Sequence, residues 1–273
     1  MTWRVIASKD YYETKDSRLI RYLVYLVVLV ILLGGYVFPA VTTGAVTTSR
    51  FAGFMTTTIG LLLPLVGLLL GYNAIVGERE SGQLALLLSL PYERRDVVAG
   101  KLVGRGVHLV LAVLVGFIGA GVLVWYPFGS VSHAAYAAYI LLTLLFGIIF
   151  FGIGLALSTL TVSKQRANVG AFGIFFLFVV VWDLVAELLR FGLEQIGLAD
   201  GTLPDWALFV HGAEPGMLYE RLVAAFFENS TAGPYLGPEA PWYLGEWMAL
   251  VLFVLWIVLP IAAGYRRFER TDL

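Results

Sequence analysis

The dominant pattern along the chain is a series of long apolar runs separated by polar segments. The runs that are long enough to cross a bilayer occupy roughly residues 20–40, 54–76, 103–126, 135–160, 168–190 and 247–264. Backbone groups inside hydrocarbon have no water to bond, so a helix is the form that satisfies them within one segment. The pattern therefore predicts an all-α polytopic membrane protein, with six transmembrane helices in a single domain that covers residues 1–273.

Composition supports a membrane location and excludes several kinds of chemistry. Hydrophobic residues make up 59% of the 273 residues and charged residues only 14%, whereas soluble domains carry about a quarter charged residues. The net charge of −1 gives no indication of nucleic-acid binding. The chain contains no cysteine, so disulfides, thiolate metal sites and cysteine nucleophiles are excluded.

The distribution of basic residues predicts the orientation of the chain. If the N-terminus lies inside, Arg50, Arg190 and Arg221 are the only members of the 18 Lys and Arg residues that fall in outer segments. Cytoplasmic loops carry an excess of Lys and Arg, so this asymmetry is a strong signal. We therefore expect a multi-pass protein of the cell membrane with both termini in the cytoplasm.

Two polar regions outside the spans have amphipathic character. Residues 1–19 mix aromatic side chains with charges of both signs, so they are interpreted as a helix along the inner membrane surface or as an ordinary cytoplasmic lead-in. Residues 191–246 form a long outer segment in which Pro215 is placed to start a short helix. This helix would be amphipathic and would sit at or dip into the outer leaflet, and residues 229–241 read as loop.

The inner segment 77–101, between the second and third spans, is the most informative part of the chain. Glu78, Arg79 and Glu80 end the second span, and Gly82 permits a tight turn. Residues 83–90 are apolar but far too short to cross a membrane. Such a helix at the cytoplasmic face needs a cover, which would be a partner protein or lipid headgroups, and an interfacial hairpin without a partner is the alternative.

Polar residues within the spans are candidates for a translocation path. Asp183, Glu187 and Arg190 share one helix face because they are spaced by four and three residues. A charge at mid-bilayer costs roughly 2.5–3.5 kcal/mol on insertion scales, so Asp183 should face protein or a water-filled cavity. Asp183 would then line the path, or the group would be an outer-leaflet ion pair in which Arg190 neutralises Glu187. Asn73 is a second candidate for the path, but a helix–helix hydrogen bond is the preferred interpretation of this residue.

The order of these elements resembles a known family. The amphipathic N-terminus, the six spans, the element IVGERESGQLALLLSLPYERRDVVAGKLVGR after the second span and the outer EPGMLYERL helix together resemble the ABC-2 class of ABC-transporter permeases. Within that class the chain is most similar to the permeases encoded with the nitrous-oxide-reductase maturation machinery. The resemblance covers essentially the whole chain and implies a type V exporter-like permease fold.

The resemblance also implies how such a protein would work. The segment after the second span would be a coupling helix that docks into a groove of a separate ATP-binding subunit. The residues that carry this expectation are Glu78, Arg79, Glu80, Gly82, Leu86, Leu87 and Leu88. ATP would be bound by that partner, so the chain itself would hold no cofactor. Two copies, or one copy with a homologue, would form the pore.

The absence of catalytic motifs agrees with a permease that has no ATPase site of its own. The chain has no G-x-x-x-x-G-K-[ST] sequence, and its three histidines, His108, His133 and His211, are scattered. We therefore expect no enzymatic activity. Two other classes stay open at this point, an ion-coupled secondary transporter that protonates Asp183 and a membrane assembly or anchoring factor. The residues name no transported substrate.

Overall fold

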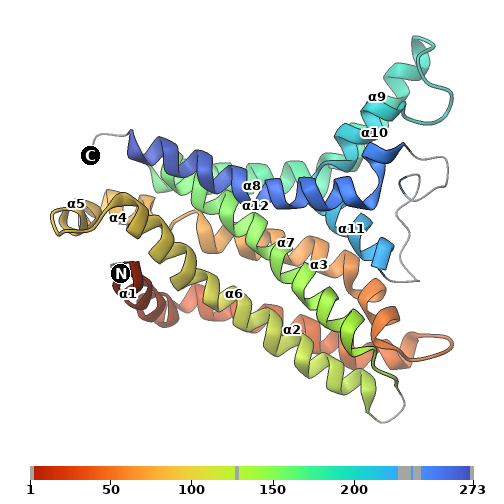
Figure 1. The fold of residues 1–273 in the computed structure, drawn as a ribbon, viewed down its shortest axis with the longest axis horizontal. Coiled ribbons are helices and arrows are strands. Elements are labelled where there is room, and N and C mark those ends of the chain that lie inside the picture. The colour runs from red at the N-terminus through yellow and green to blue at the C-terminus, as the bar shows by residue number, and fades with distance from the viewer. Residues whose placement is uncertain (1–2, 127–128, 227–234, 236–240, 271–273) are drawn as a thin grey trace.

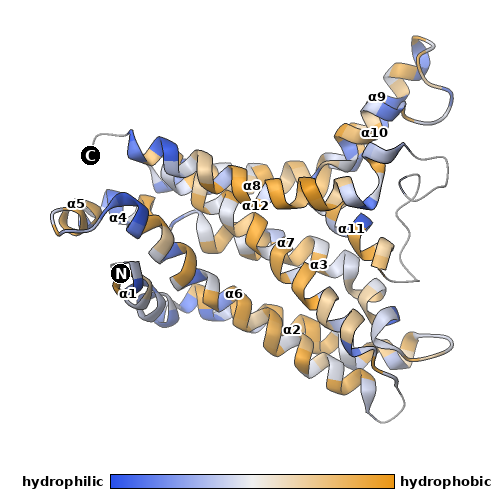
Figure 2. Ribbon diagram, in the orientation of Figure 1, coloured by the Kyte–Doolittle hydropathy of each residue, from blue (hydrophilic) through white to orange (hydrophobic). Residues whose placement is uncertain are grey.

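The computed structural model describes residues 3–126, 129–226, 235 and 241–270. Within these residues it contains six helical stretches that are long and apolar enough to cross a membrane. The predicted all-α fold with six spans is therefore confirmed. Along the spans most residues are hydrophobic, and hydrophilic residues gather on α4 and at the C-terminal end of α12 (Figure 2).

The elements follow one another along the chain as helices of very different length (Figure 1). In chain order they are α1 (Trp3–Asp16), α2 (Arg18–Val41), α3 (Thr48–Gly71), α4 (Val76–Glu80), α5 (Gln83–Leu88), α6 (Arg94–Trp125), α7 (His133–Leu160), α8 (Lys164–Phe175), the π-helix η1 (Phe176–Val181), α9 (Trp182–Gln195), α10 (Asp205–Gly212), α11 (Pro215–Phe226), the 3-10 helix η3 (Trp242–Leu244) and α12 (Glu246–Glu269).

Two spans are built differently from the simple runs that the sequence predicts. The second span is α3 followed by a turn and by α4, and the hydroxyl of Ser158 on α7 accepts hydrogen bonds from the backbone N–H groups of Ile75 (2.8 Å) and Val76 (2.9 Å) at that turn. The fifth span joins α8 and α9 through the π-helix η1. Prolines do not end the helices, because α2 continues beyond Pro39 and α3 continues through Pro64.

The centre of the bundle is the contact between α3 and α7. In the most apolar part of α7, 67% of the residues are buried, against 6% in the fifth span. Glycines allow this approach, because a Cβ atom on Gly71 would lie 2.5 Å from the carbonyl oxygen of Phe151 and one on Gly154 would lie 2.7 Å from that of Leu68. Small residues let two membrane helices bring their backbones together, and here they fix the core of the molecule.

The N-terminal helix α1 packs on protein along one side. Ile6 and Ala7 are buried, and they lie against Gly100 and Gly104 of α6. Gly100 and Gly104, which are four residues apart, therefore receive α1 rather than another membrane span. The amphipathic pattern of residues 1–19 thus has a protein partner for its buried face, and contact of its other face with the inner membrane surface stays a prediction.

The outer segment contributes a helix to the core. As expected, α11 begins at Pro215, and its apolar residues Leu218, Leu222 and Val223 are buried. The ring of Tyr219 stacks on Phe146 of α7 with 4.4 Å between the ring centroids. This helix therefore packs into the bundle more deeply than a helix at the leaflet surface would. Residues 229–234 and 236–240 of the predicted loop lie outside the described residues.

Candidate functional site

The inner segment forms a projecting element at one end of the bundle. Both α4 and α5 lie at the end where α1 begins and α12 finishes (Figure 1). Gly82 joins them with a φ of +76°, a left-handed conformation that glycine adopts without the steric cost of a side chain. The tight turn predicted at Gly82 is present, and it connects α4 to α5.

The short helix α5 has one covered and one uncovered side. Leu84 is fully buried in a cluster with Ile6 of α1, Val97 of α6 and Phe268 of α12. Leu87 and Leu88 are partly buried against the same cluster. On the other side, Leu86 is 70% exposed and Leu90, just beyond the helix, is 50% exposed. The Leu-rich run therefore holds α5 on the bundle and also offers apolar side chains to the outside.

The charged side chains of Arg79 and Glu80, which precede α5, contact neighbouring helices. Arg79 donates from Nη1 to the carbonyl oxygen of Thr161 at 2.8 Å, at the end of α7. Glu80 accepts a hydrogen bond of 2.7 Å from the backbone N–H of Lys164, the first residue of α8. These contacts connect α4 to the inner ends of two spans, so the two residues position α4.

Glu78 belongs to a group of ion pairs that the sequence alone does not reveal. Its Oε1 atom lies 2.9 Å from Nζ of Lys101 on α6 and 3.4 Å from Nζ of Lys9 on α1. Lys101 also lies 3.0 Å from Asp10, which Arg105 approaches at 3.3 Å. Lys101 and Asp10 are far from Glu78 in the chain, and the clearest sequence signal for them is that each is a charge on a helix with apolar neighbours.

Asn73 lies beside this group, at the inner end of the second span. It lines a polar crevice of about 540 Å³ together with Glu13, Arg105 and Lys164. Its Oδ1 atom is buried and has no hydrogen-bond partner among the described residues. The helix–helix hydrogen bond expected of Asn73 is therefore not made by this oxygen, and the side chain faces the polar crevice.

Asp183 lies at the other end of the molecule, in a separate cavity. The cavity has a volume of about 780 Å³, and Asp183, Glu187, Arg190, His211 and Glu220 are among its lining residues. The Asp183 side chain is 87% exposed, and its Oδ1 atom lies 3.4 Å from Nε2 of His211. Arg190 forms an ion pair with Glu187, as the spacing predicts. Burial, with a smaller effect of Asp183, raises the pKa of Glu220.

Comparison with known proteins decides the family. The profile described as "ABC-2 family transporter protein" matches residues 4–273. The chain belongs to the ABC-2 transporter family. It is 34% identical over 226 residues to the "Probable ABC transporter permease protein NosY" of Pseudomonas aeruginosa, an alignment that covers 80% of this chain and 79% of that protein. It is also 34% identical over 226 residues to the protein of the same name from Stutzerimonas stutzeri, with 77% and 76% covered.

This ABC-2 chain is thus a membrane permease subunit of an ABC transporter, and its family implies an ATP-binding partner subunit. The expected coupling residues of the permease gather at one end of the bundle, whereas Asp183 lies at the opposite end (Figure 1). Asn73 and Asp183 therefore line different cavities and do not meet in one site within the chain.

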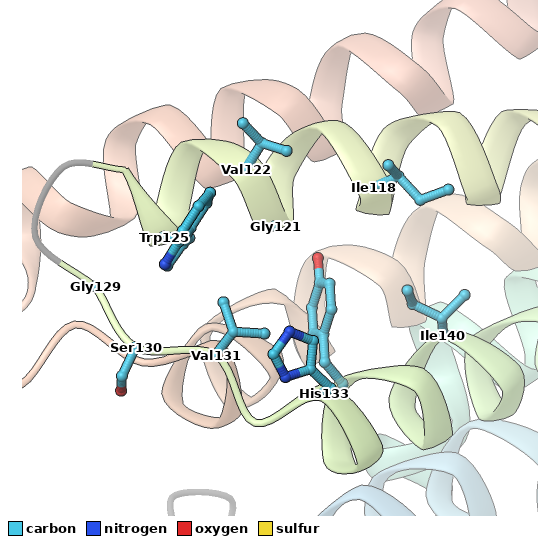
Figure 3. Close-up of a pocket in the computed structure, with 10 residues that line it drawn as sticks. Ile118, Gly121, Val122, Trp125, Gly129, Ser130, Val131, His133 and Ile140 are labelled. Atoms are coloured by element: carbon cyan, nitrogen blue, oxygen red, sulfur yellow. The ribbon is translucent and has the colours of Figure 1, made fainter.

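A third cavity of the permease contains neither of these residues. It has a volume of about 610 Å³ and lies between the outer ends of α6 and α7, where Trp125 and Ile118 are opposite His133 and Ile140 (Figure 3). Its lining is mainly apolar. His133 therefore stays apart from His211 and His108, in agreement with the scattered histidines of the sequence.

Proposed function

We propose that the ATP-binding subunit of this transporter docks on the uncovered side of α5. The observation that carries the proposal is the exposure of Leu86 and Leu90 on an element whose opposite side, at Leu84, is fully buried. Interfaces place apolar residues at their centre and polar residues at their rim. Leu86 and Leu90 would supply that centre, and the exposed Gln83 would belong to the rim.

The remaining docking residues have positional roles in this proposal. Leu87 and Leu88 fix the rotation of α5 about its axis because they are partly buried against the bundle. Glu78, Arg79 and Glu80 secure α4, and Gly82 sets the direction in which α5 leaves it. The sequence analysis expects Glu78 and Glu80 to dock on the partner themselves, whereas in this proposal they orient the docking helix.

We further propose that two copies of the chain form the transporter in the cell membrane, with both termini in the cytoplasm. The fifth span supports this arrangement because only 6% of its most apolar part is buried within one chain. It also carries Asp183 on the wall of the outer cavity. A second copy along this span would give that carboxylate a water-filled path, and lipid would cover the other apolar faces.

Docking is tested by co-expressing the tagged permease with a candidate P-loop ATPase from its own genome and measuring the ATPase recovered from detergent. The Leu86→Asp variant should lose most of the bound subunit because it places a charge at the centre of the interface. Leu87→Asp should also lower the amount of ATPase recovered, because it disturbs the packing of α5 against the bundle. Val162→Asp is the matched control, since Val162 is a 59% exposed apolar residue in the other inner link.

The opposite charge at Glu80 tests the positional role. Glu80→Arg removes the acceptor for the Lys164 N–H group, so recovery should fall less than with Leu86→Asp. Equal recovery of the ATPase with the parent chain and with Leu86→Asp would show that α5 is not the docking surface.

A further inference from the structure

The segment from α4 to α6 is a hairpin whose tip is the docking helix. Gly82 links α5 to α4, and residues 89–93 link α5 to the start of α6. Both links are non-helical, so each is a point at which the tip could rotate relative to the spans. A movement of the tip reaches the spans through the packing of Leu84 and through the two legs of the hairpin, and the legs act together only if they are joined to each other.

The base of this hairpin is closed by a buried lysine. Glu78 lies on the first leg and Lys101 on the second, and their side-chain atoms are 2.9 Å apart. Lys101 is only 1% exposed. An ion pair shielded from water is screened much less than a surface pair, and removal of one member leaves the other as an uncompensated charge. The contact therefore joins the two legs firmly.

The same ammonium group also binds the N-terminal helix. Nζ of Lys101 lies 3.0 Å from Oδ1 of Asp10, which is also buried. On either side of Lys101 in α6, Gly100 and Gly104 allow α1 to pack closely against α6. Because of this packing, α1 and the inner end of α6 form one unit, and Lys101 is the point at which α4 is attached to it.

We propose that Lys101 is a positioning residue that holds α1, α4 and the start of α6 together as one rigid unit. The proposal rests on the docking of an ATP-binding subunit at α5. When that subunit moves the tip, the closed base passes the displacement to α6 and to α1 as one rigid body. Without Lys101, α4 moves independently of α6, and the displacement of α4 is not passed on to α6 and α1.

The rigid unit is first tested in the permease alone, so that the result does not depend on the docking proposal. The chain has no cysteine, so Tyr12→Cys on α1 and Gln83→Cys on α5 introduce a unique pair of spin-label sites at exposed positions. Electron–electron distance measurements in nanodiscs should give a narrow distribution in the parent. Lys101→Met should broaden it clearly, whereas Lys9→Met should leave it narrow because Lys9 is an exposed partner of the same Glu78.

A second variant covers the case in which Lys101→Met does not fold. Glu78→Gln keeps the pair between Lys101 and Asp10 and removes only the charge that pairs α4 with Lys101. It should broaden the same distribution. A narrow distribution in Glu78→Gln, or in a folded Lys101→Met, would overturn the proposal whatever the ATPase experiment shows.

The coupling is then measured in the complex with the ATP-binding subunit. Labels at Val122→Cys on α6 and Val251→Cys on α12, both exposed, report the change in distance when a non-hydrolysable ATP analogue is added. The Glu78→Gln variant should still bind the ATP-binding subunit, with a reduced recovery like that of Glu80→Arg, and the complex that forms should lose this distance change. Leu86→Asp, in contrast, should not assemble. A full distance change in an assembled Glu78→Gln complex would overturn the proposed role of the ion pair between Glu78 and Lys101 and leave the docking proposal intact.

Discussion

The close contact between α3 and α7 predicts that Gly71→Ala destabilises the permease. A Cβ atom at this position would lie 2.5 Å from the carbonyl oxygen of Phe151, 2.6 Å from the nitrogen of Leu155 and 2.8 Å from the carbonyl carbon of Gly154. All three are backbone atoms, so no flexible side chain can move aside. Ordinary contacts of a Cβ atom start at 3.4 Å, so the two helices would have to separate by roughly an ångström.

The size of the effect follows from two opposing contributions. Overpacking of a well-packed core costs typically about 1–3 kcal/mol. Replacing glycine by alanine inside a helix gains up to about 1 kcal/mol, but Gly71 is the last residue of α3 and gains less. The overpacking term therefore dominates, and we expect a net loss of about 1–2 kcal/mol in unfolding free energy.

The assay is thermal unfolding in detergent, followed by helical circular dichroism, with a control in the same helix. Gly60 of α3 has no atom within 4 Å of the position of its Cβ, so Gly60→Ala should unfold at the parent temperature or slightly above it. Gly71→Ala should unfold at a clearly lower temperature. If Gly71→Ala proves as stable as Gly60→Ala, the backbone contact between α3 and α7 is not as close as described.

Two further predictions concern polar groups at opposite ends of the bundle. Ser158→Ala should lower the unfolding free energy by about 1–3 kcal/mol, because two buried N–H groups lose their acceptor, and thermal unfolding beside a Ser163→Ala control measures this. Burial raises the pKa of Glu214, in the outer segment before α11, to about 7, although the N–H of Met217 donates to it at 2.7 Å. The neutral acid is therefore favoured in the folded protein, so unfolding temperatures should be highest near pH 4.5, fall as the pH rises towards 7 and level off above it. Glu214→Gln should flatten this decline, and an unchanged decline in that variant would assign the pH dependence to other groups.

The outline of the coupling element could be predicted because its signals are local. A polar end of the second span, Gly82 and an apolar run too short to cross a membrane are read from neighbouring residues. The direction of each side chain could not be predicted in the same way. In a helix as short as α5, Leu86 and Leu87 are adjacent and chemically identical, and only the cluster around Leu84 and Phe268 decides which of them faces outward.

The carboxylates show the same limit. Glu78 and Glu80 look like free charges at a membrane surface, and the sequence interpretation assigned them to a partner protein. In the structure each has an internal partner more than 20 residues away in the chain, Lys101 for Glu78 and the N–H of Lys164 for Glu80. A pairing of this kind depends on how the helices pack, so local patterns carry no information about it.

The sequence by itself determined the six spans and the short helix that follows the second one, and it predicts that this helix lies on the inner side. These features come from the solvent, because a bilayer accepts long apolar helices and the Lys and Arg residues remain on one side. Only the tertiary structure decided which glycines bring backbones together, which face of α5 is uncovered and which charges Lys101 joins. Those features depend on contacts between residues remote in the chain, and such contacts exist only once the helices have packed.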